Sequence, residues 1–190
     1  MPYDNDGNRY KLDAAMEQWI PIAIERLVDV ANTYDGYITY KDLGNHVMAA
    51  TGIMYDATYR WVGGLLGPIV WHCIEKGWPP LTSLVVHQDD QSVGEGYDEN
   101  FRALGISVPS SDDLAAKLAI LDDHAAASRL ECYKFFGAEL PPGGGLATLT
   151  PKIRAARDAK RAKAKAEAPP KLCPVHNIAL PATGRCDECD

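Results

Sequence analysis

The stretch that decides the fold covers residues 39–77 and reads TYKDLGNHVMAATGIMYDATYRWVGGLLGPIVWHCIEKG. Thr39 is followed three residues later by Asp42, and this capping-box pair predicts the start of a helix. Gly52 predicts its end, because glycine readily adopts the left-handed conformation that closes a last helical turn. The first half of the stretch is therefore expected to form a helix over about residues 40–51.

A second, longer helix is predicted for the other half of the same stretch. Asp56 can cap it, Gly77 is expected to end it, and Pro68 suggests a bend inside it. Its apolar residues recur at the spacing of an amphipathic helix. The pattern predicts one buried stripe that consists of Val62, Leu65, Leu66, Ile69, Val70 and Cys73.

Both flanks of this stretch carry further secondary-structure signals. Residues 11–31 have apolar side chains at helical spacing, with Pro21 as a point where the helix would kink or restart. On the other side, residues 81–87 are rich in branched side chains and bounded by turn residues, which predicts a strand. Residues 93–97 can return as its partner and complete a hairpin.

A long helix is expected to follow, from a cap at residues 110–113 to about Phe136, with Leu114, Leu118, Leu121, Ala125 and Leu130 on its buried side. Three helices followed by a hairpin is the order of a winged helix-turn-helix. The predicted fold class is therefore mainly α with a small β-hairpin. A winged helix-turn-helix body over 1–140, which ends with the long helix, would precede a Pro/Gly and then basic linker over 141–172 and a zinc ribbon over 173–190.

The formal net charge of −7 conceals a strong asymmetry. Residues 1–150 contain 10 basic and 21 acidic residues, a net charge of −11. Residues 151–172 contain 8 basic and 2 acidic residues, a net charge of +6, and almost no large apolar side chains. This segment is expected to be a solvated linker, at most transiently helical, whose basic residues attract phosphates. The candidate phosphate contacts are Lys152, Arg154, Arg157, Lys160, Arg161, Lys163 and Lys165.

The chain ends in a metal-binding pattern. Cys173 and His176 form one ligand pair, and Cys186 and Cys189 form another, each pair with two residues between its ligands. This spacing lets one tight turn aim both ligands at the same ion, and two such turns complete a tetrahedron. Because four protein ligands leave no open position for water, the sequence predicts a structural zinc ion rather than a catalytic one.

Four short motifs suggest a family. They are I-T-Y-K-D-L from Ile38, R-W-V-G-G-L-L from Arg60, P-L-T-S-L-V-V from Pro80 and G-E-G-Y from Gly94. In this order they resemble the C-terminal winged-helix domain of the alkylguanine-DNA alkyltransferases and of their non-catalytic, alkyltransferase-like relatives. The similarity covers residues 38–97, about a third of the chain, and its most specific part is the R-x-V-G-G element.

The resemblance implies roles for a few residues. Tyr40 matches the family's tyrosine that lies against the phosphate of a flipped nucleotide. Arg60 matches the arginine that enters the minor groove and takes the place of the extruded base. Gly63 and Gly64 would let the helix approach the nucleic-acid backbone closely, and Tyr59 precedes Arg60 on the same surface. The alternative is that Arg60 is a solvated helix residue and that the glycines serve helix packing.

The sequence also departs from this family. The family's P-C-H-R element is replaced by Pro80-Leu-Thr-Ser-Leu84, so the acceptor cysteine is missing and alkyl transfer is chemically excluded. The net charge of −11 over residues 1–150 also opposes duplex binding by that part of the chain. The preferred interpretation is a non-catalytic nucleic-acid-binding protein, with DNA as the expected partner.

Two other interpretations stay open. The acidic N-terminal part can be a protein-interaction module that grips a basic partner through its exposed aromatic residues, predicted as Tyr55, Tyr59, Trp61 and Trp78. Alternatively, the chain can be an enzyme acting on DNA, of nuclease or base-excision type, with a site near His87, Asp89 and Glu95. Without a run of 18 apolar residues or a basic-then-apolar leader, the protein is expected to be cytoplasmic and to have no membrane partner.

Overall fold

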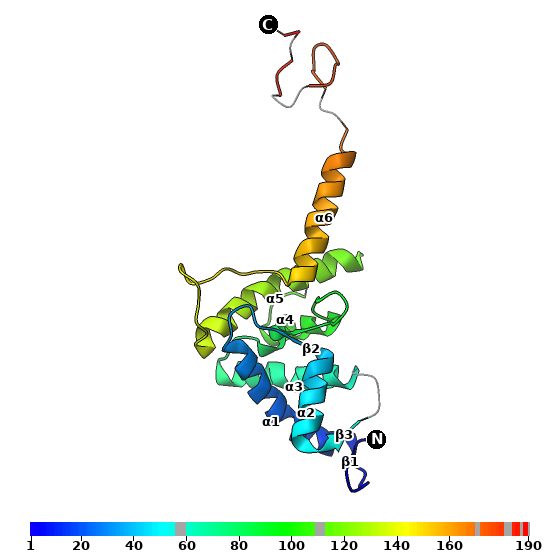
Figure 1. Cartoon of the computed structure of the whole chain (residues 1–190), viewed down its shortest axis with the longest axis vertical. Helices are drawn as coiled ribbons and strands as arrows, with labels where there is room; N and C mark the ends of the chain where they lie inside the picture. Colours follow the sequence, from blue (N-terminus) through cyan, green and yellow to red (C-terminus); the bar gives the residue numbers. More distant parts are fainter. Residues whose placement is uncertain (56–59, 109–112, 170–171, 181–183, 187, 190) are drawn as a thin grey trace. The chain divides into compact units, whose positions relative to one another are not determined.

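The computed structural model describes residues 1–55, 60–108, 113–169, 172–180, 184–186 and 188–189. Two compact units emerge, Met1–Ile153 and Arg154–Asp190, which we call the body and the tail. The elements in chain order (Figure 1) are β1 Tyr3–Asp4, α1 Leu12–Ala31, β2 Ile38–Thr39, α2 Tyr40–Thr51, β3 Ile53–Met54, α3 Arg60–Lys76, η1 Leu81–Leu84, β4 Val85–Val86, η2 Glu95–Asp98, α4 Glu99–Ala103, α5 Leu114–Phe136 and α6 Pro151–Glu167. The mainly helical class with a small two-stranded sheet is confirmed.

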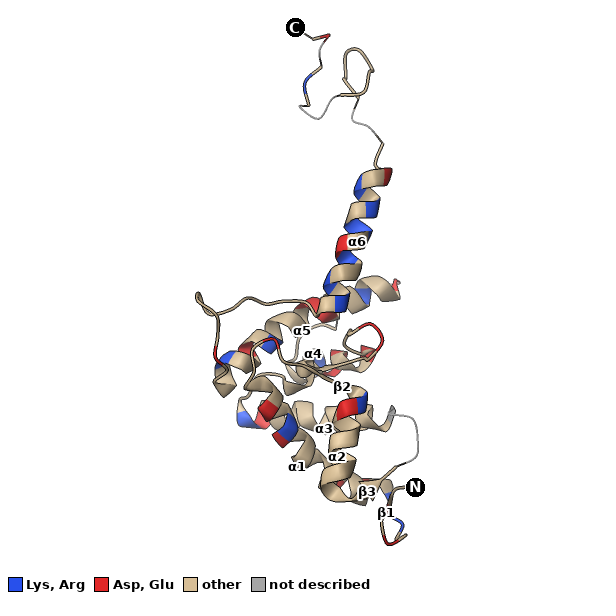
Figure 2. Ribbon diagram, viewed as in Figure 1, with Lys and Arg blue, Asp and Glu red and all other residues tan. Residues whose placement is uncertain are grey.

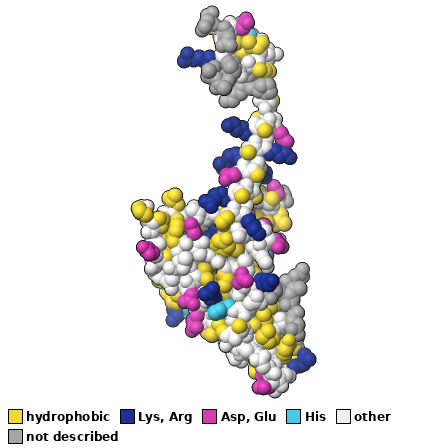
Figure 3. Space-filling view, in the orientation of Figure 1, with side chains coloured by type: hydrophobic (Ala, Val, Ile, Leu, Met, Phe, Trp, Pro, Cys, Tyr) yellow, Lys and Arg dark blue, Asp and Glu magenta, His cyan; other side chains and the backbone are white. Residues whose placement is uncertain are grey.

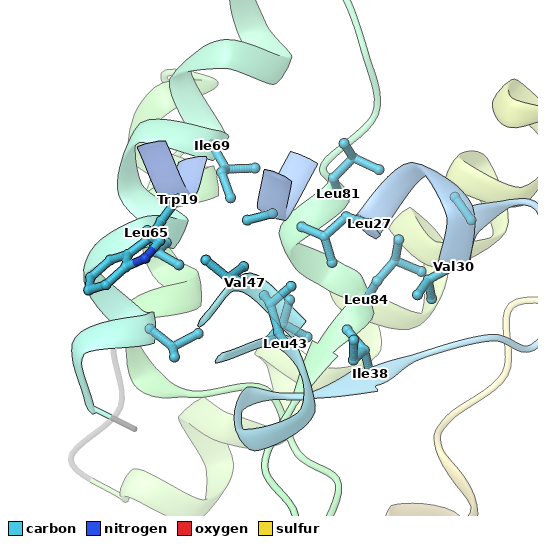
Figure 4. Close-up of a cluster of buried hydrophobic side chains, with 14 of the residues drawn as sticks. Trp19, Leu27, Val30, Ile38, Leu43, Val47, Leu65, Ile69, Leu81 and Leu84 are labelled. Atoms are coloured by element: carbon cyan, nitrogen blue, oxygen red, sulfur yellow. The ribbon is translucent and has the colours of Figure 1, made fainter. Parts of the chain in front are cut away.

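One hydrophobic core holds α1, α2, α3 and η1 together (Figure 4). Trp19 and Leu27 of α1 are completely buried in it, as are Leu43 and Val47 of α2. The indole of Trp19 lies 4.4 Å from the ring of Trp61, measured between centroids. α1 runs through Pro21 as one helix rather than restarting there.

The capping signals of the deciding stretch act as predicted. The Thr39 side chain accepts a hydrogen bond from the backbone N–H of Asp42, and its hydroxyl donates to the Asp42 carboxylate at 2.7 Å. α2 ends at Gly52, which has the left-handed φ of 70°. In α3 the predicted stripe is buried except for Leu66, which is partly buried. The predicted cap of α3, Asp56, lies outside the described residues.

The predicted wing differs from the structure in its pairing. Of the expected strand 81–87, only Val85–Val86 is extended, and it pairs in parallel with Ile38–Thr39. Residues 93–97 do not return as a strand, because the backbone N–H of Val93 donates to the Asp122 carboxylate of α5 and η2 begins at Glu95. The remaining strands, β1 and β3, form an antiparallel pair of their own.

A second, smaller core joins η2 and α4 to α5. Its buried members are Val86, Val93, Tyr97, Phe101, Leu121 and Ala125. The predicted buried side of α5 is confirmed at Leu121 and Ala125, whereas Leu118 and Leu130 are partly buried. The prediction is wrong for Leu114, which is 50% exposed, because the first turn of α5 extends beyond this core.

The segment between α5 and α6 packs against the body rather than leaving it at Leu140. The Leu146 N–H donates to the Tyr34 hydroxyl at 3.0 Å, and the Thr148 hydroxyl donates to the Asp35 carboxylate at 2.8 Å. The Thr150 hydroxyl donates to the carbonyl of Gln91. We call residues 146–150 the strap; with it, the body extends to Ile153 instead of the predicted residue 140.

The basic linker, predicted as a solvated and at most transiently helical segment, forms the helix α6 over Pro151–Glu167. None of its residues is buried, so burial in a core does not account for this helix. Its many Ala, Lys and Arg residues have high intrinsic helix propensity, which supplies the local reason for it. Among the described residues, no helix combines the length and the apolar character needed to cross a lipid bilayer.

Candidate metal centre and nucleic-acid-binding surfaces

The four predicted metal ligands come together in the tail. The ligand atoms of Cys173, His176, Cys186 and Cys189 all lie within 4.8 Å of one another. His176 Nδ1 is 3.8, 3.5 and 3.4 Å from the sulfur atoms of Cys173, Cys186 and Cys189, respectively. The Sγ atoms of Cys173 and Cys189 are 3.5 Å apart.

These separations fit one four-coordinate ion. Zn–S and Zn–N bonds of about 2.3 and 2.0 Å in a tetrahedron place two sulfur atoms about 3.8 Å apart and a sulfur and a nitrogen about 3.5 Å apart. The three sulfur–nitrogen distances and the Cys173–Cys189 sulfur–sulfur distance, 3.4–3.8 Å, are close to these values, and all the ligand atoms lie within 4.8 Å of one another. The cluster can therefore hold a metal ion, with three thiolates and one imidazole as ligands.

A tight turn prepares the first ligand pair. The Cys173 N–H donates to the Ile178 carbonyl, the Asn177 N–H donates to the Cys173 carbonyl, and Asn177 has a left-handed φ of 54°. This turn points the N–H groups of Val175 and His176 at the Cys173 sulfur, and these bonds lower the pKa of the Cys173 thiol. A thiol with a lowered pKa is deprotonated more readily, which is the state that binds a metal.

The basic residues of the linker are displayed on α6. Figure 2 shows them along the length of the helix, and Figure 3 shows their side chains projecting from it. Because a helix turns 100° per residue, one stripe gathers four of them at spacings of three, four and four residues: Arg154, Arg157, Arg161 and Lys165. Lys160 and Lys163 lie on another side of the helix.

Lys152 has a different role from the other basic residues. Its ammonium group donates to the backbone carbonyls of Gln88 and Asp89, and its N–H donates to the side chain of Gln91. Gln91, whose φ is 60°, also donates to the Tyr37 hydroxyl. Lys152 therefore fastens the start of α6 to the loop after β4, and its ammonium group is already engaged within the body.

A hollow of the described body lies between α2, α3, β4 and η2, with a volume of about 660 Å³. Tyr40 and His87 stand on one wall with their rings stacked at 4.9 Å and 23°. The Gly94 N–H donates to the Tyr40 hydroxyl, which is half-buried, and burial raises the pKa of this phenol. A Cβ atom at Gly94 would lie 3.0 Å from that hydroxyl, so a glycine allows this close contact.

The structure separates the two glycines that the sequence grouped together. Gly63 lines the hollow, and a Cβ atom there would meet nothing within 4 Å. Gly64 faces α1 instead, where a Cβ atom would lie 3.0 Å from Met16 Cε. Gly63 therefore borders open space in the hollow, whereas Gly64 lies against α1. Tyr59 and the side chain of Arg60 lie outside the described residues.

The structure brings only two of the three residues of the alternative catalytic site into the same hollow. His87 and Glu95 line the same hollow. Asp89 is exposed, and its backbone carbonyl accepts from Lys152 in the loop. The His87 ring stacks on the ring of Tyr40, a contact between residues 47 positions apart that no local sequence signal indicates.

The aromatic residues predicted to contact a protein partner also differ in how far they are exposed. Trp61 is only 7% exposed and packs on Trp19, so its prediction as a surface residue is wrong. Its side chain is needed to complete the core beside α1. Tyr55 is partly buried against the same cluster, and Trp78 is partly buried near the end of α3.

Comparison with protein-family models, with curated proteins and with solved structures gives no match to this chain. The resemblance to the alkyltransferase-like winged helix therefore depends on the sequence motifs alone.

Proposed function

We propose that this protein binds nucleic acid, preferably DNA, without catalysing a reaction on it. The observation that carries the proposal is α6, a helix of 17 residues with no buried side chain and seven basic residues. A helix that contributes nothing to a core and displays so much positive charge is suited to a polyanionic partner.

Electrostatics support α6 rather than the body as the main contact. Each phosphate that a lysine or arginine neutralises releases condensed counterions, and this release drives sequence-independent binding. Residues three to four positions apart on the stripe from Arg154 to Lys165 are separated by about 5–6 Å along the helix axis, so they can follow a phosphate backbone together. The net charge of −11 over residues 1–150 opposes such binding by the body.

The ion in the tail is proposed to be zinc in a structural role. Three thiolates and one imidazole are a ligand set typical of structural zinc, and four protein ligands leave no position for a substrate or water. The thiols must stay reduced to bind it, which fits a cytoplasmic location. Zinc would hold a short segment that has few side chains of its own to bury.

The body is proposed to add groove or lesion recognition. In the alkyltransferase-like hypothesis, Tyr40 and Arg60 act on a flipped nucleotide, and Tyr40 and Gly63 both line the hollow of about 660 Å³. The bare backbone at Gly63 suits the close approach that such recognition needs. The winged-helix assignment of the body belongs to this same hypothesis.

The test is fluorescence anisotropy of a labelled duplex across a salt series. Replacing Arg154, Arg157, Arg161 and Lys165 with glutamine should weaken binding and reduce the slope of log K against log salt by up to about 3.6, if each residue neutralises one phosphate. The matched control removes four exposed charges from the body, at Arg9, Lys41, Lys76 and Lys134. An equal loss of duplex affinity in both variants, or no loss in either, would refute the role of α6.

The contribution of the body has a separate test. A duplex that carries 2-aminopurine reports an unstacked, flipped nucleotide as a rise in fluorescence. Arg60→Ala should abolish the rise while the salt-dependent affinity from α6 persists. A rise that is unchanged in Arg60→Ala would remove this residue from the hypothesis.

A further inference from the structure

A second hollow, of about 320 Å³, lies along α3 and shares the lining residues Val70 and Asn100 with the larger one. Its α3 wall also carries Ile74, and Trp78 lines it just beyond the end of the helix. The Trp78 indole is held by edge-to-face contacts with His72 at 5.5 Å and Phe136 at 5.2 Å. This wall is therefore apolar and fixed in position.

The opposite wall is one stripe of α5. His124, Ser128 and Glu131 follow one another at spacings of four and three residues, so they lie on the same side of the helix. The Tyr97 hydroxyl lies 3.0 Å from His124 Nδ1 and 3.3 Å from Ser128 Oγ. These two polar groups already have hydrogen-bond partners inside the protein, so they do not need a hydrogen bond from a ligand.

Large apolar side chains extend from the hollow onto the surface. Ile74 and Leu104, which line it, are 38% and 45% exposed. Phe135, one turn after Glu131 on α5, is 53% exposed and lies 6.5 Å from Trp78. Trp71, one turn before Ile74 on α3, is 49% exposed. Contiguous exposed apolar residues around a hollow are typical of a protein-binding surface.

Charge indicates the character of the partner. Among the described residues that line this hollow, Glu131 is the one Asp, Glu, Lys or Arg, and no described residue forms an ion pair with it. The other titratable residue of the lining is His124, whose pKa is lowered by burial, which favours its neutral form. Residues 1–150 as a whole carry a net charge of −11. A nucleic-acid strand would bring phosphates to this carboxylate and is disfavoured, whereas lysine or arginine beside an apolar side chain is complementary.

We propose that this groove, formed by α3, α5 and Leu104, docks a basic amphipathic segment of a partner protein. One large apolar side chain of the segment enters the hollow beside Trp78, neighbouring apolar side chains cover Phe135 and Trp71, and a lysine or arginine pairs with Glu131. This is the helix-in-groove mode of recognition, in which apolar anchors supply the affinity and charges set the specificity. The site is distinct from α6 and does not depend on nucleic-acid binding.

The four tryptophans provide a built-in control for the test. Trp78 lines the groove and Trp71 is exposed beside it, one turn from Ile74, whereas Trp19 and Trp61 lie in the core, 0% and 7% exposed. The full-length protein is titrated with a helical peptide that has leucines on one face and lysines on the other. The indole N–H signals of Trp71 and Trp78, assigned with Trp→Phe variants, should shift, and those of Trp19 and Trp61 should not. Shifts of all four signals, or of neither groove signal, would overturn the proposal.

Variants then separate the apolar contact from the charge. Phe135→Ser should lower the affinity for the lysine peptide at least about tenfold. Glu131→Gln should lower the affinity for the lysine peptide. The variant should then bind this peptide about as weakly as a matched peptide that has glutamates in place of the lysines. Leu114→Ser, on the same helix and 50% exposed, is the matched control and should have no effect. Equal binding of the two peptides by the unaltered protein would exclude a basic partner.

A further titration distinguishes this site from the proposed function. The glutamine variant of the α6 stripe should still bind the lysine peptide through the groove, even if it no longer binds DNA. A single-stranded oligonucleotide should leave the Trp71 and Trp78 signals in place. If the oligonucleotide moves them and the lysine peptide does not, the groove is a nucleic-acid site and the proposal fails.

Discussion

The body and the tail obtain their structure in opposite ways. In the body, residues far apart in the sequence share a core in which Trp19 and Leu27 have no exposed surface. In the tail, α6 buries no residue, and the segment beyond it converges on four ligand atoms. The body is thus stabilised by non-local apolar burial, whereas the tail relies on local helix propensity and on metal coordination.

This difference explains how one chain can combine an acidic surface and a basic surface. A core tolerates an acidic exterior, because its stability depends on the apolar residues inside. A helix that needs no core can devote its surface to basic residues, since no side chain has to face a neighbour. The two regions should therefore respond independently to changes, and four predictions test that independence.

The largest effect is expected from loss of the metal. Cys186→Ser, or a chelator, should remove the ordered structure of the ligand-bearing segment, because metal binding contributes about 10–16 kcal/mol to such small modules. NMR signals of residues 172–189 should collapse to random-coil positions, while signals of the body stay in place. Arg185→Gln, next to the ligand, is the control and should preserve the folded signals. Signals that keep their dispersion after chelation would disprove a metal-dependent fold.

The next largest effect concerns the core alone. Trp19→Ala should lower the free energy of unfolding of the body by about 3–5 kcal/mol, because it leaves a cavity between α1 and α3. Urea unfolding measures this change, and metal content reports on the tail, which should be unaffected. Trp71→Ala removes an indole that is 49% exposed and should change the stability by only about 0.5 kcal/mol. Metal loss in Trp19→Ala would show that the regions are coupled.

A smaller loss is expected at the start of α2. Thr39→Ala removes the side chain that accepts the Asp42 N–H, which should destabilise the body by about 1 kcal/mol. Thr39→Ser keeps the oxygen and should restore most of the stability. Equal urea midpoints for the alanine variant and the unaltered protein would mean that packing alone holds α2.

The smallest effect should be confined to α6. Ala162→Gly disfavours the helix by about 1 kcal/mol locally, and because α6 has no buried residue, the body should unfold at an unchanged urea concentration. The Cα chemical shifts around residue 162 report the loss of helicity. A shift of the body's unfolding midpoint would contradict the separation of the two units.

Local signals in the sequence predicted much of the fold. The Thr39–Asp42 cap, the Gly52 stop and the α3 stripe depend on residues close together in the chain, and the structure confirms them. The ligand cluster was predictable for the same reason, since each pair of ligands is separated by two residues. For the segment that forms α6, the sequence predicted at most a transient helix, because it has almost no large apolar residues with which to build a core, whereas the structure shows a helix over Pro151–Glu167.

Features that depend on distant partners could not be predicted. The parallel pairing of β2 with β4 replaces the expected hairpin, because Val93 is held by Asp122 of α5. The stacking of Tyr40 on His87 and the different surroundings of Gly63 and Gly64 also arise only in the folded chain. The DNA contacts and the role of Arg60 stay predictions.

The strap has a consequence for the smallest fragment that can fold. The Arg129 guanidinium is buried, with 4% of the residue exposed, and donates to the carbonyls of Ser83 and Thr148. A fragment ending at Leu140, where composition alone suggests a boundary, would lose the Thr148 carbonyl and leave part of this cation without a partner. An incompletely satisfied buried charge is strongly destabilising, so a shortened protein that keeps the strap through Ile153 should express as a folded unit, whereas one cut at 140 should be prone to aggregation.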